Sequence, residues 1–123
     1  MIDGQLSPWV AKYEQYVKLP RLLIEKCITS IQFNDRAHDL EHVYSVCRLG
    51  YLLGLREGMT EVECKMIQAG CLMHDLGCRY DRDSHHFISY GLAFEYLDNW
   101  AKGVFTPEQI MVIANSCYEH RAS

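Results

Sequence analysis

Apolar residues recur at the three- and four-residue spacing of an amphipathic helix along most of the chain, and no stretch alternates with the two-residue period of a strand. Turn and capping residues divide this pattern into helical segments that start at Ser7-Pro8, cover 21–33, 38–56, 61–75 and 85–100, and start again at Thr106-Pro107. Thr60 and Glu63 have the spacing of a capping box, and 77–83 is predicted as a polar loop. The pattern predicts an all-α fold, a single bundle of about six helices.

The 123 residues carry a formal net charge of −4 and suffice for one hydrophobic core, so we expect one domain over 1–123. A negative net charge argues against general binding to nucleic acid or to a membrane surface. It still allows a nucleotide whose phosphates meet a metal and a few arginines. No segment has the length and apolarity of a membrane span, and the first ten residues lack a secretion signal. We therefore expect a cytoplasmic protein, with the oligomeric state left open.

Six cysteines could indicate disulfides or a zinc site, but none of them form a Cys-x-x-Cys pair. Without a secretory context, a disulfide framework is not expected. Cys27, Cys47, Cys64 and Cys71 fall in apolar stretches of the predicted helices, where thiols act as small apolar side chains. Core packing is the prediction for these four cysteines.

The dipeptide His74-Asp75 closes a long apolar helix. Burying an unpaired polar group costs about 1–3 kcal/mol, so an imidazole and a carboxylate at this position need a partner. A divalent metal ion would supply one, because neutral imidazole and carboxylate are both good ligands. The alternative is a helix C-terminus with a histidine that has no role, which the dipeptide alone does not exclude.

The other candidate histidines also follow from helix periodicity. His42 shares a face with apolar residues of its helix and is predicted to point toward the core. His38 and Asp39 stand at the start of that helix, where local capping is the simpler explanation. His85 opens the next helix on its inward face, after Ser84 as the predicted N-cap. His120, near the end of the last helix, is by itself more typical of a surface residue.

In this order, the motifs resemble the HD superfamily of metal-dependent phosphohydrolases, in particular its small stand-alone members, over about residues 20–120. The first segment has the form His-Asp-x-x-His-x-x-x-Val, and the signature pair is His74-Asp75. The resemblance implies a helical bundle of the HD type. It implies metal ligands at His42, His74 and Asp75, with His85 as the next ligand in members that have extra histidines, and His120 as a candidate for the last.

The chain departs from the family pattern at two places. The family's closing ligand is usually an aspartate on a later helix, whereas the last aspartate here is Asp98, which precedes the final helix. Three interpretations stay open: the chain is truncated at its C-terminus, His120 substitutes, or the site is incomplete. The family also often carries a lysine four residues after the paired histidine, and Cys78 occupies that place.

The resemblance implies a metal-dependent phosphohydrolase that acts on a nucleotide or another small phosphate ester through a metal-activated water. His74 and Asp75 would be catalytic, and Arg79 could meet the substrate phosphate, because a guanidinium binds phosphate bidentately. The divalent ion could be Mn, Mg, Fe, Co, Ni or Zn, among which the sequence does not distinguish.

Two other functions stay open. Some HD relatives are oxygenases with a di-iron centre and extra histidines, and His85 with His120 would suit such a centre. A non-catalytic module that binds metal or nucleotide would instead agree with the missing closing aspartate. Spectroscopy of bound iron tests the first alternative, and binding without turnover would support the second.

Overall fold

The computed structural model describes residues 4–35, 39–80 and 83–119. Within these ranges the chain forms six α-helices and a short 3-10 helix, and no strand. The elements are α1 (Ser7–Glu14), α2 (Arg21–Ile31), α3 (Leu40–Arg56), α4 (Glu61–Met73), η2 (Leu76–Arg79), α5 (His85–Trp100) and α6 (Pro107–Glu119). The all-α, six-helix prediction is confirmed. Over the described residues, no helix has the length and apolarity needed to cross a membrane.

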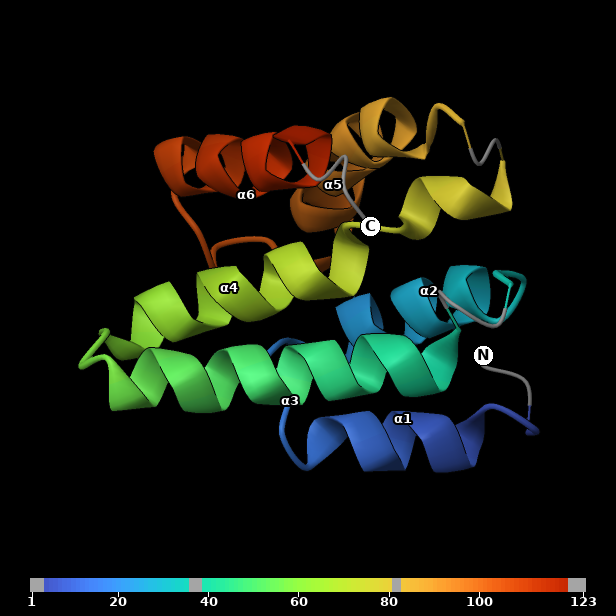
Figure 1. Cartoon of the computed structure of the whole chain (residues 1–123), viewed down its shortest axis with the longest axis horizontal. Coiled ribbons are helices and arrows are strands. Elements are labelled where there is room, and N and C mark those ends of the chain that lie inside the picture. Colours follow the sequence, from blue (N-terminus) through green and yellow to red (C-terminus); the bar gives the residue numbers. More distant parts are fainter. Residues whose placement is uncertain (1–3, 36–38, 81–82, 120–123) are drawn as a thin grey trace.

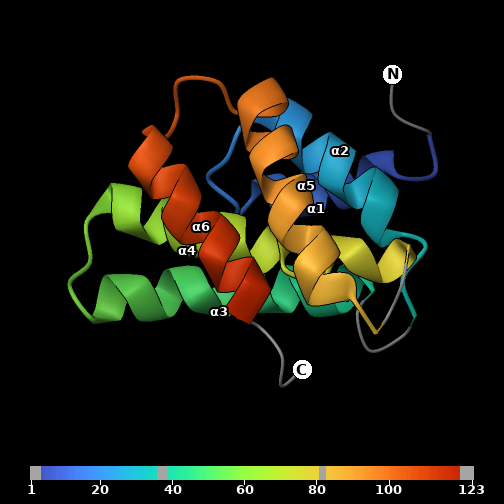
Figure 2. The same ribbon diagram turned by 90° about the horizontal axis from the view of Figure 1, so that it is seen from above.

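The helices pack largely as neighbouring pairs (Figures 1 and 2). α3 and α4 lie side by side as an antiparallel pair, α5 and α6 form a second pair, and α6 also contacts α4. α1 lies beside α3, where the Tyr13 hydroxyl donates to the carbonyl of Leu40 at 2.6 Å. α2 contacts α1, α5 and η2. Its fully buried apolar side chains are Leu23, Ile24, Cys27, Ile28 and Ile31.

Side-chain hydrogen bonds cap the starts of α3, α4 and α6. Thr60 and Glu63 form the predicted capping box of α4, and the start of α6 has the same reciprocal arrangement between Thr106 and Gln109. Ser84 is the N-cap residue of α5, as predicted, but its side chain makes no capping hydrogen bond. These caps satisfy backbone N–H groups that a helix start otherwise leaves without partners.

A buried glutamine joins α4 to the segment between α1 and α2. Gln68 is fully buried; its side-chain oxygen accepts from the Lys18 backbone N–H at 2.8 Å, and its amide nitrogen donates to the Tyr16 carbonyl at 2.6 Å. Those two backbone groups precede α2 and lie outside any helical ladder. A polar side chain in the apolar face of α4 therefore holds the chain at this bend.

The predicted polar loop after His74-Asp75 is in part a buried helical turn. η2 occupies its first half, and Leu76 and Gly77 are buried there. The Gly77 backbone N–H donates to the Ser89 hydroxyl of α5 at 2.8 Å. A Cβ atom at position 77 would overlap the carbonyl oxygen of His85, so only glycine allows η2 to approach the start of α5 this closely. This contact positions the residues on either side of it.

Candidate metal centre

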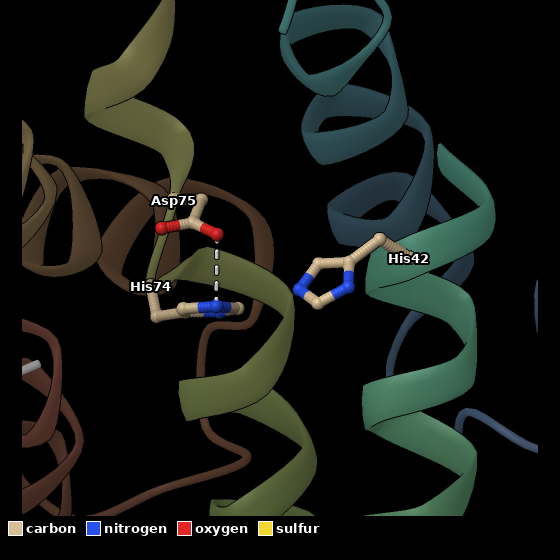
Figure 3. A group of neighbouring side chains, drawn as sticks. All are labelled: His42, His74 and Asp75. Carbon is tan, nitrogen blue, oxygen red and sulfur yellow. Dashed lines mark ion pairs between the residues drawn. The ribbon is translucent and has the colours of Figure 1, made fainter. Parts of the chain in front are cut away.

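The first turn of α3 meets the C-terminal end of α4 in a cluster of two histidines and one aspartate (Figure 3). One ligand atom from each of His42, His74 and Asp75 lies within 4.8 Å of the other two. The predicted metal-binding residues His42, His74 and Asp75 are thus brought together, as the order of the motifs suggested.

Local structure sets the direction of His42. The Asp39 side chain caps α3 by accepting from the His42 backbone N–H at 3.0 Å. This fixes His42 in the first turn, and Figure 3 shows its ring pointing from α3 toward His74. The centroids of the two imidazole rings are 6.4 Å apart. His42 is half-buried, so one side of the cluster is open to solvent.

His74 is oriented by the last turn of its own helix. Its ring Nδ1 lies 2.5 Å from the Cys71 carbonyl oxygen, and its Nε2 lies 2.9 Å from Oδ2 of Asp75. Because a carbonyl oxygen can only accept, Nδ1 carries the proton, and in a neutral ring Nε2 is then an acceptor. Nε2 of His74 and Oδ2 of Asp75 are then two hydrogen-bond acceptors 2.9 Å apart, and such a pair requires a proton or a cation beside it. Both atoms are also metal ligands, so the pair fits a metal ion.

Asp75 is held at its backbone and is almost fully buried. Its side chain is about 1% exposed, and its carbonyl accepts from the Asn34 side-chain amide at 3.1 Å, which joins the end of α2 to the cluster. Taking a carboxylate out of water is costly unless a cation or strong hydrogen bonds compensate. The negative charge is therefore placed where a divalent ion would be strongly attracted.

His85 contacts the other oxygen of the same carboxylate. Its Nε2 lies 3.3 Å from Oδ1 of Asp75, and the residue is buried at the start of α5. The structure therefore places His85 against the carboxylate oxygen that does not contact His74. Cys78 of η2 lies nearby: ligand atoms of Asp75, Cys78 and His85 also lie within 4.8 Å of one another.

The remaining predicted site residues are Arg79 and His120. Arg79 is exposed at the end of η2, and its guanidinium lies over the Phe33 ring at 4.4 Å from the centroid. His120 and His38 lie outside the described residues, so the question of a closing ligand stays a prediction.

The sequence analysis did not identify Cys78 as a candidate metal ligand. It identified this position as the place of a lysine in the resembling family and assigned Cys78 no ligand role, and the segment was expected to be a polar loop. A 3-10 helix turns every three residues, so the residue three after Asp75 lies on the same side as Asp75. The spacing Asp75-x-x-Cys78 could have indicated this if the helical turn had been anticipated.

An apolar pocket adjoins the cluster. It has a volume of about 510 Å³ between α3, α4 and α6, and His74 contributes to its wall. Its other lining residues are mostly apolar, among them Val46, Ile67, Cys71 and Ile113, with Glu63 and Ser116 as polar members. Small-molecule sites have volumes of roughly 300–1,000 Å³ and mostly apolar linings. The pocket has the size and character to take part of a small ligand beside the cluster.

No protein-family model matches the chain, and comparison with curated proteins and with solved structures found no match either. The candidate centre therefore rests on its own geometry.

Proposed function

We propose that the chain is a metal-dependent phosphohydrolase that acts on a nucleotide or another small phosphate ester. The observation that carries this proposal is the convergence of His42, His74 and Asp75 at the junction of α3 and α4. The motif order that resembles the HD superfamily supports it independently, because the same three residues were selected from the sequence.

The donor set suits a divalent ion of intermediate hardness. Two imidazole nitrogens and one carboxylate oxygen are typical ligands of Zn, Fe, Mn, Co and Ni. Bound there, the ion supplies Lewis acidity, which lowers the pKa of water and polarises a phosphoryl oxygen. The hydrogen bond from His74 Nδ1 to the Cys71 carbonyl directs Nε2 into the cluster, as second-shell partners of metal-binding histidines do.

Arg79 is the candidate for phosphate binding. The guanidinium carbon of Arg79 lies 4.4 Å from the centroid of the Phe33 ring, and phosphate is bound by the N–H groups in the plane of a guanidinium. A cation–π contact restrains the side chain without requiring these N–H groups as hydrogen-bond donors. Its position four residues after Asp75, at the end of η2, supports a role at the rim of the centre.

The apolar pocket beside His74 supports a substrate with more than a phosphate group. A base, sugar or acyl group could enter it while the phosphate meets the ion. Uncharged lining residues such as Ile67 and Val112 would contribute through burial of apolar surface.

The test is phosphate release by the purified chain, stripped with a chelator and then loaded in turn with Mn, Mg, Fe, Co, Ni or Zn. The substrates are a panel of nucleotides and sugar phosphates. We expect release with at least one ion, and loss of release in His74→Ala and His42→Ala. The matched control is His86→Ala, because His86 lies on α5 outside both clusters, with its ring beside Tyr118.

An ion-loaded chain that releases no phosphate from any substrate would contradict hydrolysis. Ion or nucleotide binding without turnover would then identify the non-catalytic module. Oxygen consumption that depends on iron would identify the oxygenase alternative.

A further inference from the structure

Asp75 presents its two carboxylate oxygens to two different histidines. Oδ2 lies 2.9 Å from Nε2 of His74, and Oδ1 lies 3.3 Å from Nε2 of His85. The carboxylate is therefore positioned to meet one cation on each oxygen. The Oδ2 side is the centre proposed above, and the Oδ1 side is not used by it.

Cys78 adds a third donor of different chemistry beside Asp75 and His85. Its sulfur, a ring nitrogen of His85 and a carboxylate oxygen of Asp75 all lie within 4.8 Å of one another. Asp75 and His85 are buried and Cys78 is half-buried. Sulfur, imidazole nitrogen and carboxylate oxygen form a ligand set that proteins use for zinc and similar ions.

The backbone holds these three residues together without an ion. The Cys78 N–H donates to the Asp75 carbonyl at 3.1 Å, which closes the turn that carries both side chains. The Gly77 N–H donates to the Ser89 hydroxyl at 2.8 Å, and Gly77 itself touches the backbone of His85. The turn and the first residue of α5 are thus fixed against each other, so little rearrangement is needed for binding.

We propose that Asp75, Cys78 and His85 form a second cation site, in which the Cys78 thiolate makes the site selective for thiophilic ions such as Zn or Co over Mg or Mn. The proposal shares Asp75 with the proposed centre but does not use His42. It needs no catalytic activity, so it can fail or hold independently of the phosphohydrolase proposal.

Two nearby cysteines serve as internal controls. Cys71 lines the apolar pocket, where burial raises the pKa of its thiol to about 11. The Cys117 thiol lies 4.0 Å from the Gly70 carbonyl, and burial raises its pKa to about 12. Neither residue belongs to the Asp75, Cys78 and His85 group. Substituting them should leave the second site intact.

The experiment is a titration of the chelator-stripped full chain with Co(II), followed by absorption and by metal analysis. Thiolate ligation to Co(II) gives a near-ultraviolet charge-transfer band. We expect this band in the unmodified chain, in Cys71→Ser and in His42→Ala, and its loss in Cys78→Ser. The second equivalent of Co(II) should bind at least about 10-fold more weakly in Cys78→Ser, since even second-shell changes cost 10–100-fold. A missing band in the unmodified chain, or a band that persists in Cys78→Ser, overturns the proposal.

A second measurement avoids any dependence on the folding of a variant. The unmodified chain is treated with iodoacetamide with and without Zn, and alkylation at each cysteine is located by mass spectrometry. Ion binding should slow alkylation of Cys78 and leave the rate at Cys71 unchanged. Equal rates at Cys78 with and without Zn overturn the proposal. Loss of phosphate release in His42→Ala alongside an intact Co(II) band would separate the two sites.

Discussion

At the scale of single residues, Asp75 combines deep burial with a negative charge, and this combination is costly when no ion is present. Asp75→Asn removes the charge but keeps the shape of the side chain. We expect the metal-free variant to be as stable as the unmodified chain or more stable, because a buried charge no longer needs compensation. The variant should also lose metal-induced stabilisation, which at an ion concentration of about 100 times Kd is roughly 2.7 kcal/mol.

Thermal unfolding in chelator and in excess metal measures both effects. Asp98→Asn is the control, because Asp98 is exposed on α5 and belongs to neither cluster. A strong loss of stability of Asp75→Asn in chelator would instead assign the carboxylate a structural role.

His120 is the remaining candidate for a closing ligand, although it lies outside the described residues. If it binds the ion together with His42 and His74, His120→Ala should weaken metal affinity by about 10-fold or more and abolish phosphate release. Isothermal titration with the preferred ion, compared with His86→Ala, measures the affinity. Unchanged affinity and full activity in His120→Ala would exclude this role.

At the scale of elements, the contact between η2 and α5 positions Cys78 and His85 next to Asp75. In Gly77→Ala the new methyl group would overlap the backbone of His85, so the two elements must separate. We expect a loss of about 1–3 kcal/mol in the free energy of unfolding, as for other overpacked sites, together with weaker metal binding. Urea unfolding and metal titration measure the two effects.

Gly91→Ala is the matched control for this substitution. Gly91 lies within α5, and a Cβ atom there meets nothing within 4 Å. Alanine should therefore stabilise this helix by about 0.5–1 kcal/mol, because glycine loses more backbone entropy on folding. Equal effects of the two substitutions would show that close packing at Gly77 does not matter.

The elements were largely predictable, because helix period and caps are local signals. Thr60 with Glu63 marked the start of α4, and the inward faces of His42 and His85 followed from their spacing. Gln68 could not have been predicted to join α4 to the bend before α2, because its partners are backbone groups distant in the sequence. Arg79 over Phe33 is a contact of the same kind. The site was predictable where it follows helix periodicity, and not where it depends on tertiary contacts.

At the scale of the whole molecule, the core contains several ionisable groups that are buried as neutral species. Burial raises the pKa of the Cys27, Cys47, Cys71 and Cys117 thiols, and also that of the Tyr13 hydroxyl. In the unfolded chain the thiols lose protons near pH 9, whereas in the folded chain Cys71 does so only near 11 and Cys117 near 12. Above pH 9 the unfolded chain therefore binds fewer protons than the folded chain.

It follows that stability is fully present below about pH 9 and falls as the pH rises through the range between 9 and 12. Each shifted thiol should cost about 1 kcal/mol of the free energy of unfolding at pH 10. Urea unfolding of metal-free protein at neutral pH and near pH 10 measures the decrease, and Cys71→Ser should show a smaller one. A urea midpoint that does not move up to pH 10 would contradict the prediction.

The shared carboxylate of Asp75 has a thermodynamic consequence for the two proposed ions. An ion on Oδ1 withdraws electron density and places a like charge near Oδ2, so it should lower the affinity there. Linkage requires the reverse effect to have the same magnitude. The two sites would then fill stepwise rather than all at once, and the affinity of the site that contains His42 would depend on whether a thiophilic ion already occupies the site that contains Cys78. Occupancy of the site that contains His42 would therefore depend on the concentration of thiophilic ions as well as on that of its own ion.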